Sequence, residues 1–144
     1  MRVYRITRAE YAQDLTGKGA ALRGGRWNRR GIPMLYSANS TALAALELRV
    51  NIDIDLPKLS RVVVEIPEDL ISGDAPVFFP DLNSSREYGS AWALGLDTLC
   101  LKVLSSVLPN ADDSFNVLIN SAHPKIDQVR IVDIATFEFD SRLF

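Results

Sequence analysis

Residues 23–31 combine side chains that bind anions with glycines that let a backbone approach a ligand. These nine residues contain four arginines and three glycines. The guanidinium group offers a planar fork of donors that matches phosphate or carboxylate, and glycine allows a close approach or a positive φ. A short apolar run follows and ends on the aromatic Tyr36. The segment therefore predicts an anion-binding loop next to an aromatic ring.

The next segment predicts a helix that carries a carboxylate on its apolar side. Ser40 suits the N-cap position, and residues 41–50 are rich in Ala and Leu. At about 100° per residue, one apolar stripe contains Leu43, Leu46 and Val50. Glu47 lies within that stripe, and a carboxylate turned towards a core requires a cation or hydrogen-bond donors. Residues 23–31, called the arginine loop below, precede the helix and can supply such a partner.

A structural explanation of the same residues is equally available. A Gly-Arg loop is often a solvated turn, and an inward Glu on a helix is often half of a structural ion pair. Perturbed carboxylates nevertheless gather at functional sites. The residues alone leave both interpretations of Glu47 open.

Length and composition indicate an ordinary globular domain. The 144 residues suffice for one domain, which we expect to span residues 1–144. Hydrophobic residues make up 47% and charged residues 24%, and the net charge of −2 gives no reason to expect direct nucleic-acid contact. The single cysteine, Cys100, excludes an internal disulfide and fits a reducing compartment. No signal-peptide pattern or membrane-length apolar run is present, so we expect a cytoplasmic protein without membrane contact.

Strands are expected to position most of these residues. β-prone or apolar runs predict strands at 2–7, 32–36, 61–66, 99–104 (continuing towards 107) and 129–139. Residues 115–120 form a short apolar element between two asparagines. Three prolines predict a long loop over 67–83, and a capping box at Ser84 to Glu87 predicts the start of a second helix. Residues 8–22 indicate a loop or a weak helix, and the last strand is expected to be broken or bulged near Ala135. Strands with a minority of helix, not regularly alternating, predict the α+β class.

Arg5 has two possible environments in the first strand, because it points away from Tyr4 and Ile6. If those two side chains face the core, Arg5 is solvated. If the sheet has a cleft on its other side, Arg5 lines that cleft.

Several common catalytic and cofactor motifs are missing. No P-loop is present, and the glycines at 24 and 25 lack the spacing of a dinucleotide fingerprint. One histidine, His123, and one cysteine cannot form the usual zinc site. His123 could serve a serine triad only with Ser105 or Ser106, and no nucleophile-elbow sequence surrounds either serine.

The sequence resembles the RES domain, a family that contains the toxins of bacterial RES–Xre toxin–antitoxin pairs. The similar pieces occur in the family's order from residue 4 to residue 143. They are Tyr4-Arg5, Gly24-Gly25-Arg26-Trp27-Asn28, Leu35-Tyr36, Ala45-Leu46-Glu47, Ser106, Asn116-Val-Leu-Ile-Asn120, His123-Pro124 and Phe139-Asp140-Ser-Arg142-Leu143. Two positions depart from the family, which usually has proline where this chain has Ser105 and Ser121.

The resemblance implies an ADP-ribosyltransferase-like fold, a split and curved sheet with helices around a cleft. It also implies cleavage of the nicotinamide–ribose bond of NAD⁺ with water or phosphate as acceptor and without a metal. Transfer of ADP-ribose to a protein is the alternative activity, and a non-catalytic protein-binding module is a third. An Xre-type helix-turn-helix antitoxin is the implied partner, which would block the cleft and contact DNA in place of this chain.

The family's functional positions correspond to particular residues of this sequence. The catalytic set would be Glu47, Arg26 and Tyr36, and the substrate-binding set would be Arg5, Arg26, Tyr36, Ser106, Trp27, Asn28 and Asn116. Arg26, with Arg5 nearby, would hold the diphosphate, and Tyr36 would flank the nicotinamide ribose. Glu47 would stabilise positive charge at the anomeric carbon. Ser106 would bond to the substrate or orient Glu47.

Overall fold

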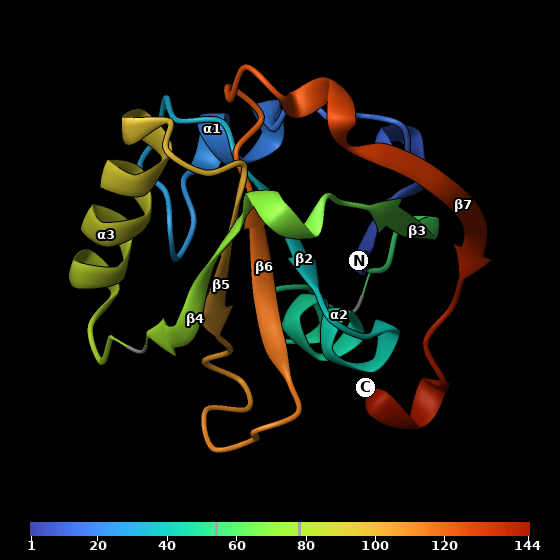
Figure 1. Cartoon of the computed structure of the whole chain (residues 1–144). Helices are drawn as coiled ribbons and strands as arrows, with labels where there is room; N and C mark the ends of the chain where they lie inside the picture. Colours follow the sequence, from blue (N-terminus) through green and yellow to red (C-terminus); the bar gives the residue numbers. More distant parts are fainter. Residues whose placement is uncertain (54, 78) are drawn as a thin grey trace.

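The computed structural model describes residues 1–53, 55–77 and 79–144, which form one seven-stranded sheet with helices around it (Figure 1). The sheet order is β4-β5-β6-β2-β1-β3-β7. The strands are β1 (Arg2–Arg8), β2 (Leu35–Ala38), β3 (Leu59–Glu65), β4 (Ile71–Val77), β5 (Cys100–Leu104), β6 (Phe115–Ile119) and β7 (Arg130–Phe137). The helices are α1 (Lys18–Arg23), α2 (Thr41–Arg49) and α3 (Leu82–Gly95), with short 3₁₀ turns elsewhere. The predicted α+β class is confirmed.

The sheet is divided in its middle. β1 and β2 share only the pair Tyr4↔Ala38, whereas β1 and β3 pair over seven residues and β2 and β6 over four. All neighbouring strands are antiparallel except β4 and β5, which are parallel. The resulting halves, β1-β3-β7 and β4-β5-β6-β2, match the expected split sheet.

Helices α2 and α3 cover different parts of the sheet (Figure 1). On α2, Leu43 and Ala44 are buried and pack with Ala38, Tyr4 and Ile6 beside the division of the sheet. Trp92 and Ala93 of α3 pack instead against residues of β5 and β6, including Leu101 and Leu118. A third apolar cluster, with Val3, Val62, Val64, Val117 and Ile119, joins the two halves of the sheet. No helix in the described ranges is long and apolar enough to span a membrane.

Several predicted elements are confirmed. β1 and β3 occur where the β-prone runs predicted them, and α2 begins after Ser40, whose Oγ accepts a hydrogen bond from the Leu43 N–H at 3.1 Å. The stretch 115–120 is strand β6. Residues 8–22 contain a 3₁₀ turn and most of the short α1. The apolar run at 32–36 becomes a strand only from Leu35.

Other predictions of elements were wrong. The proline-rich loop contains β4, because an edge strand tolerates a residue such as Pro76 that cannot complete a ladder. α3 begins at Leu82 and not at Ser84, since Asp81 is the N-cap and accepts from the Ser84 N–H at 2.7 Å. β5 stops at Leu104. β7 is continuous through Ala135, and its irregularity lies opposite Val63 and Val64.

The predicted apolar stripe of α2 was also wrong at two of its three positions. Leu43 is buried, but Leu46 and Val50 are 38% and 62% exposed. The helix turns Ala44, Glu47 and Leu48 towards the division of the sheet. Glu47 therefore faces inward for a reason other than the predicted stripe.

Candidate functional site

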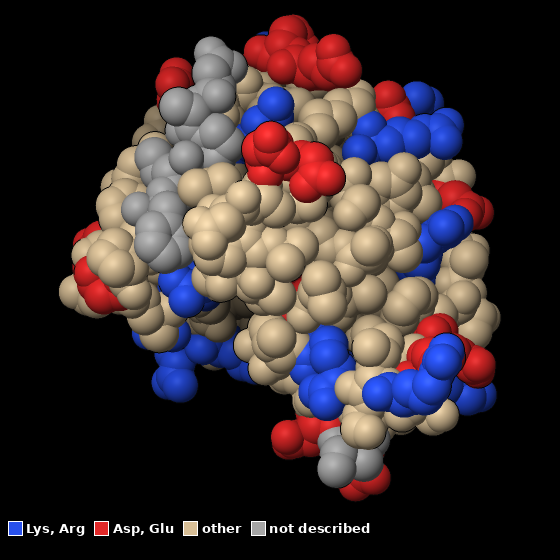
Figure 2. Space-filling model, turned by 90° about the horizontal axis from the view of Figure 1, so that it is seen from below, with Lys and Arg blue, Asp and Glu red and all other residues tan. Residues whose placement is uncertain are grey.

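A cavity of about 210 Å³ opens where the sheet divides. Its walls come from β1, β2, α2, β6 and the turn that follows α2. The lining residues are Tyr4, Arg5, Ile6, Tyr36, Ser37, Ala38, Ala44, Glu47, Leu48, Asn51 and Asn116. From below, the molecular surface is hollowed beside a group of Lys and Arg side chains (Figure 2). Four residues predicted for the site, Arg5, Tyr36, Glu47 and Asn116, thus line one cavity.

One oxygen of Glu47 is fixed by two hydrogen bonds. Glu47 Oε1 accepts from Ser105 Oγ at 2.6 Å and from Asn116 Nδ2 at 2.7 Å. Among the described residues, Oε2 has no hydrogen-bond partner and no arginine lies within ion-pair distance of the carboxylate. The predicted arginine partner was therefore wrong, because neutral donors satisfy this carboxylate. Oε2 is the oxygen left to act on a ligand.

Ser105, not Ser106, orients Glu47. Ser105 is fully buried, and its Oγ accepts from the N–H groups of Val107 and Leu108 at 3.0 and 3.2 Å. Its hydroxyl proton is thereby directed to Glu47. Ser106 is half-buried and makes no hydrogen bond to Glu47. The orienting role expected of Ser106 belongs to its neighbour, which stands where the family usually has proline.

The two serines give a direct test. Ser105→Ala would leave one donor on Glu47 Oε1 and two backbone N–H groups without a partner. If the chain has the NAD⁺-cleaving activity that the family resemblance implies, we expect its kcat to fall about tenfold, on the scale of one lost charge-assisted hydrogen bond, and to fall less in Ser106→Ala. The comparison requires both variants to show the wild-type fold by circular dichroism. A larger loss in Ser106→Ala would return the role to Ser106.

Tyr36 joins the cavity to the arginine loop. Its hydroxyl donates to Asn28 Oδ1 at 2.6 Å and accepts from the Trp27 N–H at 3.0 Å. Asn28 in turn donates to the carbonyls of Ala20 and Ile32 at 2.9 and 3.0 Å. Burial raises the pKa of Tyr36 to about 12, so the hydroxyl keeps its proton at neutral pH. The ring can face a ligand while the hydroxyl anchors the loop.

Tyr36→Phe is therefore expected to loosen the loop more than the cavity. The change leaves the Trp27 N–H and Asn28 Oδ1 without their partner, which should lower the free energy of unfolding by about 1–3 kcal/mol. Urea denaturation measures this directly. An unchanged free energy of unfolding would show that the hydroxyl does not hold the loop.

Trp27 and Asn28, both predicted to bind substrate, do not line the cavity. Their exposed fractions are 3% and 0%. The Trp27 ring packs edge-on against Phe79 and Tyr88, with centroids 6.0 and 6.3 Å apart. Trp27 and Asn28 therefore stabilise the loop, because the Trp27 ring packs on other aromatic rings and the Asn28 side chain forms hydrogen bonds within the protein.

The two predicted arginines differ in their surroundings. Arg5 lines the cavity, and its Nη1 donates to the Asp14 carbonyl at 3.2 Å. Burial lowers the pKa of the Arg5 guanidinium, and the nearby Asp14 carboxylate opposes that shift. Of the two environments left open by the sequence, the solvated one is excluded. Arg26 is half-buried and does not line the cavity, and its guanidinium makes no hydrogen bond or ion pair within the described part of the chain.

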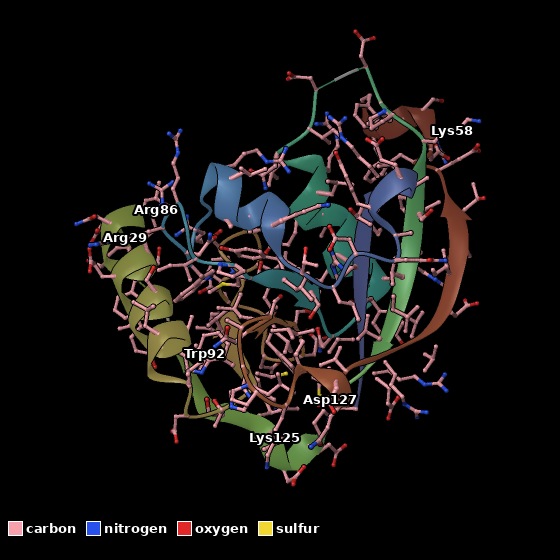
Figure 3. The ribbon with its side chains drawn as sticks, turned by 90° about the horizontal axis from the view of Figure 1, so that it is seen from above. Arg29, Lys58, Arg86, Trp92, Lys125 and Asp127 are labelled. Atoms are coloured by element: carbon pink, nitrogen blue, oxygen red, sulfur yellow. The ribbon has the colours of Figure 1, made fainter. Side chains whose placement is uncertain are left out.

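Helix α3 holds the arginine loop through contacts that the sequence did not suggest. Ser85 Oγ donates to the Arg26 carbonyl at 2.6 Å, and Arg86 Nε donates to the Gly25 carbonyl at 2.8 Å. One turn later, Ser90 Oγ accepts from the Arg29 N–H at 3.0 Å. Arg29 and Arg86 both lie at the N-terminal end of α3 (Figure 3). The nearest sequence signal was the run of small residues on α3.

Glycine is required at two points of this assembly. A Cβ on Gly25 would lie 2.6 Å from the Tyr36 hydroxyl oxygen, and a Cβ on Gly89 would lie 1.9 Å from the Trp27 carbonyl oxygen. Both approaches are closer than any side chain permits. The glycines thus let the loop lie between Tyr36 and α3.

The described residues contain no cluster of side chains of the kind that usually binds a metal ion. In residues 1–53, 55–77 and 79–144, no three His, Cys, Asp or Glu side chains gather closely enough to hold an ion. The site that the described residues form consists of a carboxylate, an aromatic ring, amide and hydroxyl donors, and arginines.

Comparisons with known proteins identify the family and the fold of the chain. The chain is similar to a Prs ADP-ribosylating toxin of Sphingobium sp. (strain YBL2), with 34% identity over 99% of this chain and 94% of the relative. It is also 33% identical to a Toxin Res of Photorhabdus laumondii, over 99% of this chain and 97% of the relative. The M. tuberculosis MbcT–MbcA toxin–antitoxin complex contains a chain with the same fold, at a TM-score of 0.68 and 16% identity over 94% of this chain and 83% of that one. The RES domain family model matches residues 2–140, and the chain therefore belongs to the RES domain family.

Proposed function

We propose that this protein is the toxin of a toxin–antitoxin pair and that it cleaves the nicotinamide–ribose bond of NAD⁺. The observation that carries the proposal is the Glu47 carboxylate, which faces a cavity with one oxygen fixed and the other available. RES family membership and the relatives named as toxins support the same conclusion.

The size of the cavity suits one end of NAD⁺. At about 210 Å³ it is smaller than the roughly 300–1,000 Å³ typical of sites that enclose a drug-sized ligand. The nicotinamide ribose would occupy it, with Tyr36 beside the flat cationic ring. The diphosphate would then lie outside the cavity, where the arginine loop provides guanidinium groups.

The residues present support a dissociative cleavage. The bond from the anomeric carbon to the pyridinium nitrogen breaks, and both electrons leave with neutral nicotinamide. Oε2 of Glu47 would stabilise the positive charge that develops on the ribose and accept a hydrogen bond from its 2′-hydroxyl. Ser105 and Asn116 bond to Oε1 and thereby hold the carboxylate that presents Oε2. Water then donates an electron pair to the anomeric carbon and releases a proton to the solvent. Where phosphate is the acceptor, one of its anionic oxygens forms the bond and no proton has to leave that oxygen.

Product analysis tests the proposal and identifies the acceptor. Purified protein incubated with NAD⁺ should release nicotinamide with ADP-ribose in water alone, or with ADP-ribose 1″-phosphate when phosphate is the acceptor. Chromatography of reactions with and without phosphate distinguishes these products. Intact NAD⁺ after long incubation of folded protein would contradict the proposal.

Protein ADP-ribosylation is the second candidate, and the relative named Prs ADP-ribosylating toxin favours it. The same cavity would cleave NAD⁺, but a protein side chain would take the ADP-ribose. Labelled NAD⁺ mixed with a cell lysate separates the two activities, because transfer labels one protein band and consumption labels a small molecule. A non-catalytic binding module, the third candidate, predicts no thermal shift with millimolar NAD⁺.

An antitoxin partner follows from the same proposal. A chain that depletes NAD⁺ harms its own cell unless it is blocked, and the fold is shared with a toxin solved in complex with its antitoxin. We propose an Xre-type helix-turn-helix protein that covers the cavity and contacts DNA itself. Co-expression with such a partner should restore growth and abolish NAD⁺ cleavage.

A further inference from the structure

Arg86 is a cation at the site for which neither the sequence motifs nor the proposed mechanism provides a role. It projects from α3, is half-buried, and uses Nε to bond to the Gly25 carbonyl at 2.8 Å. The terminal nitrogens of its guanidinium have no hydrogen-bond or ion-pair partner within the described residues. The neighbouring Arg29 differs, because it forms an ion pair with Glu87.

Short contacts connect Arg86 to the cavity. The Gly25 residue that it holds packs against the Tyr36 hydroxyl, and Tyr36 lines the cavity. The positive charge of Arg86 opposes the burial that raises the pKa of Tyr36 to about 12. Arg86 therefore lies on the arginine-loop side of Tyr36, and Glu47 lies with Tyr36 on the cavity wall.

The arrangement resembles half of a phosphate clamp. A guanidinium is planar, so a hydrogen bond at Nε restrains the orientation of its two terminal amino groups as well. Two donors held in this way match two oxygens of a phosphate. Arg26, the residue after Gly25, has a guanidinium without a partner in the described part of the chain. Arg26 and Arg86 come from different elements, the loop and α3, and these elements are joined by the bonds from Arg86 Nε to the Gly25 carbonyl and from Ser85 Oγ to the Arg26 carbonyl.

We infer that Arg86 is an anion-binding residue of this site and, together with Arg26, binds a phosphate group of the reactants. The inference rests on the proposed function. The phosphate could belong to the diphosphate of NAD⁺ or to an inorganic phosphate acceptor, and both present the same oxygens to the guanidinium. Arg86 does not contact the reacting carbon, so it contributes binding and orientation.

Steady-state kinetics of Arg86→Gln measure which phosphate is bound. Loss of one charge-assisted contact should raise the KM for NAD⁺ about tenfold if the diphosphate is bound, with kcat changed less. If Arg86 binds the acceptor, the KM for inorganic phosphate rises instead and that for NAD⁺ does not. Arg130→Gln makes the same charge change on an exposed side chain at the start of β7, outside the cavity and the arginine loop, and should leave both values within twofold.

A second measurement excludes a merely structural role. Arg86→Gln also removes the bond to Gly25 and could displace the loop, which would weaken every ligand. Calorimetry with ADP-ribose and with nicotinamide riboside, which lacks phosphate, separates the effects. We expect only the phosphate-bearing ligand or inorganic phosphate to bind more weakly, and Arg86→Lys, which keeps the charge, to recover part of the loss.

Distinct outcomes overturn the two proposals. Unchanged KM values for NAD⁺ and phosphate in an active Arg86→Gln variant would overturn the role of Arg86 and leave NAD⁺ cleavage standing. Equal weakening of nicotinamide riboside and ADP-ribose would also overturn it. Wild-type protein that neither binds nor cleaves NAD⁺ would remove the proposed function and this inference together.

Discussion

Glu47→Gln is expected to lower kcat for NAD⁺ cleavage by about 10²–10³-fold while KM stays within a few-fold of wild type. The replacement has the same shape and can still accept from Ser105 and Asn116. It puts an amide in place of the free Oε2, so the charge that would stabilise the oxocarbenium-like transition state is lost. Because the interaction matters mainly in the transition state, kcat falls and binding does not. Nicotinamide release at saturating NAD⁺ measures the effect.

A folding control accompanies this result, since Glu47 also accepts two hydrogen bonds inside the protein. Glu138→Gln makes the same substitution at an exposed glutamate and should keep full activity. Both variants should melt close to wild type, as the amide oxygen preserves the two donor contacts. Turnover near the wild-type rate in folded Glu47→Gln would remove Glu47 from the mechanism.

The sequence could predict helix α2 and strand β3, because both depend on local chemistry. Ser40 caps α2 through a contact three residues away, and β3 contains three consecutive β-branched valines, at positions 62–64. Glu47 was predicted inward from a stripe that the fold does not bury, since Leu46 and Val50 are exposed. Helical spacing limits which residues share a face, but packing against the sheet decides which face is buried.

The contacts that hold Glu47 and the loop could not be predicted in the same way. Ser105 and Asn116 reach Glu47 from 58 and 69 residues away in sequence. The bonds from Ser85 and Arg86 to the loop span 59 and 61 residues. Such pairings depend on the strand order, which no local pattern encodes. The family resemblance supplied Asn116 but indicated Ser106, one residue from the serine that makes the bond.

The two glycines of α3 differ in whether packing requires them. In the sequence, Gly89 and Gly95 both weaken a predicted helix. In the structure, nothing lies within 4 Å of a Cβ added to Gly95, whereas a Cβ on Gly89 would collide with the backbone of Trp27. Gly89 is therefore a packing requirement of the arginine loop, and Gly95 is only a cost to the helix.

Gly89→Ala is accordingly expected to destabilise the protein and to weaken NAD⁺ binding together. A Cβ 1.9 Å from the Trp27 carbonyl oxygen forces α3 and the loop apart, at a cost of about 1–3 kcal/mol for overpacking. The better helix propensity of alanine, worth about 1 kcal/mol, offsets part of that cost. The displaced loop carries Arg26 and the backbone that Tyr36 anchors, so the KM for NAD⁺ should rise. Urea denaturation and steady-state kinetics measure the two effects.

Gly95→Ala is the matched control in the same helix. With open space around its Cβ, the alanine should stabilise the protein by about 0.4–1 kcal/mol, because it restricts the unfolded chain and favours the helix. The opposite signs expected from one chemical change isolate the contact with Trp27 from the effect of propensity. Equal stability of the two variants with an unchanged KM for NAD⁺ would mean that the loop does not depend on its contact with α3. The contact between α3 and the arginine loop would then not be needed to position Arg26 and Arg86 for binding a phosphate.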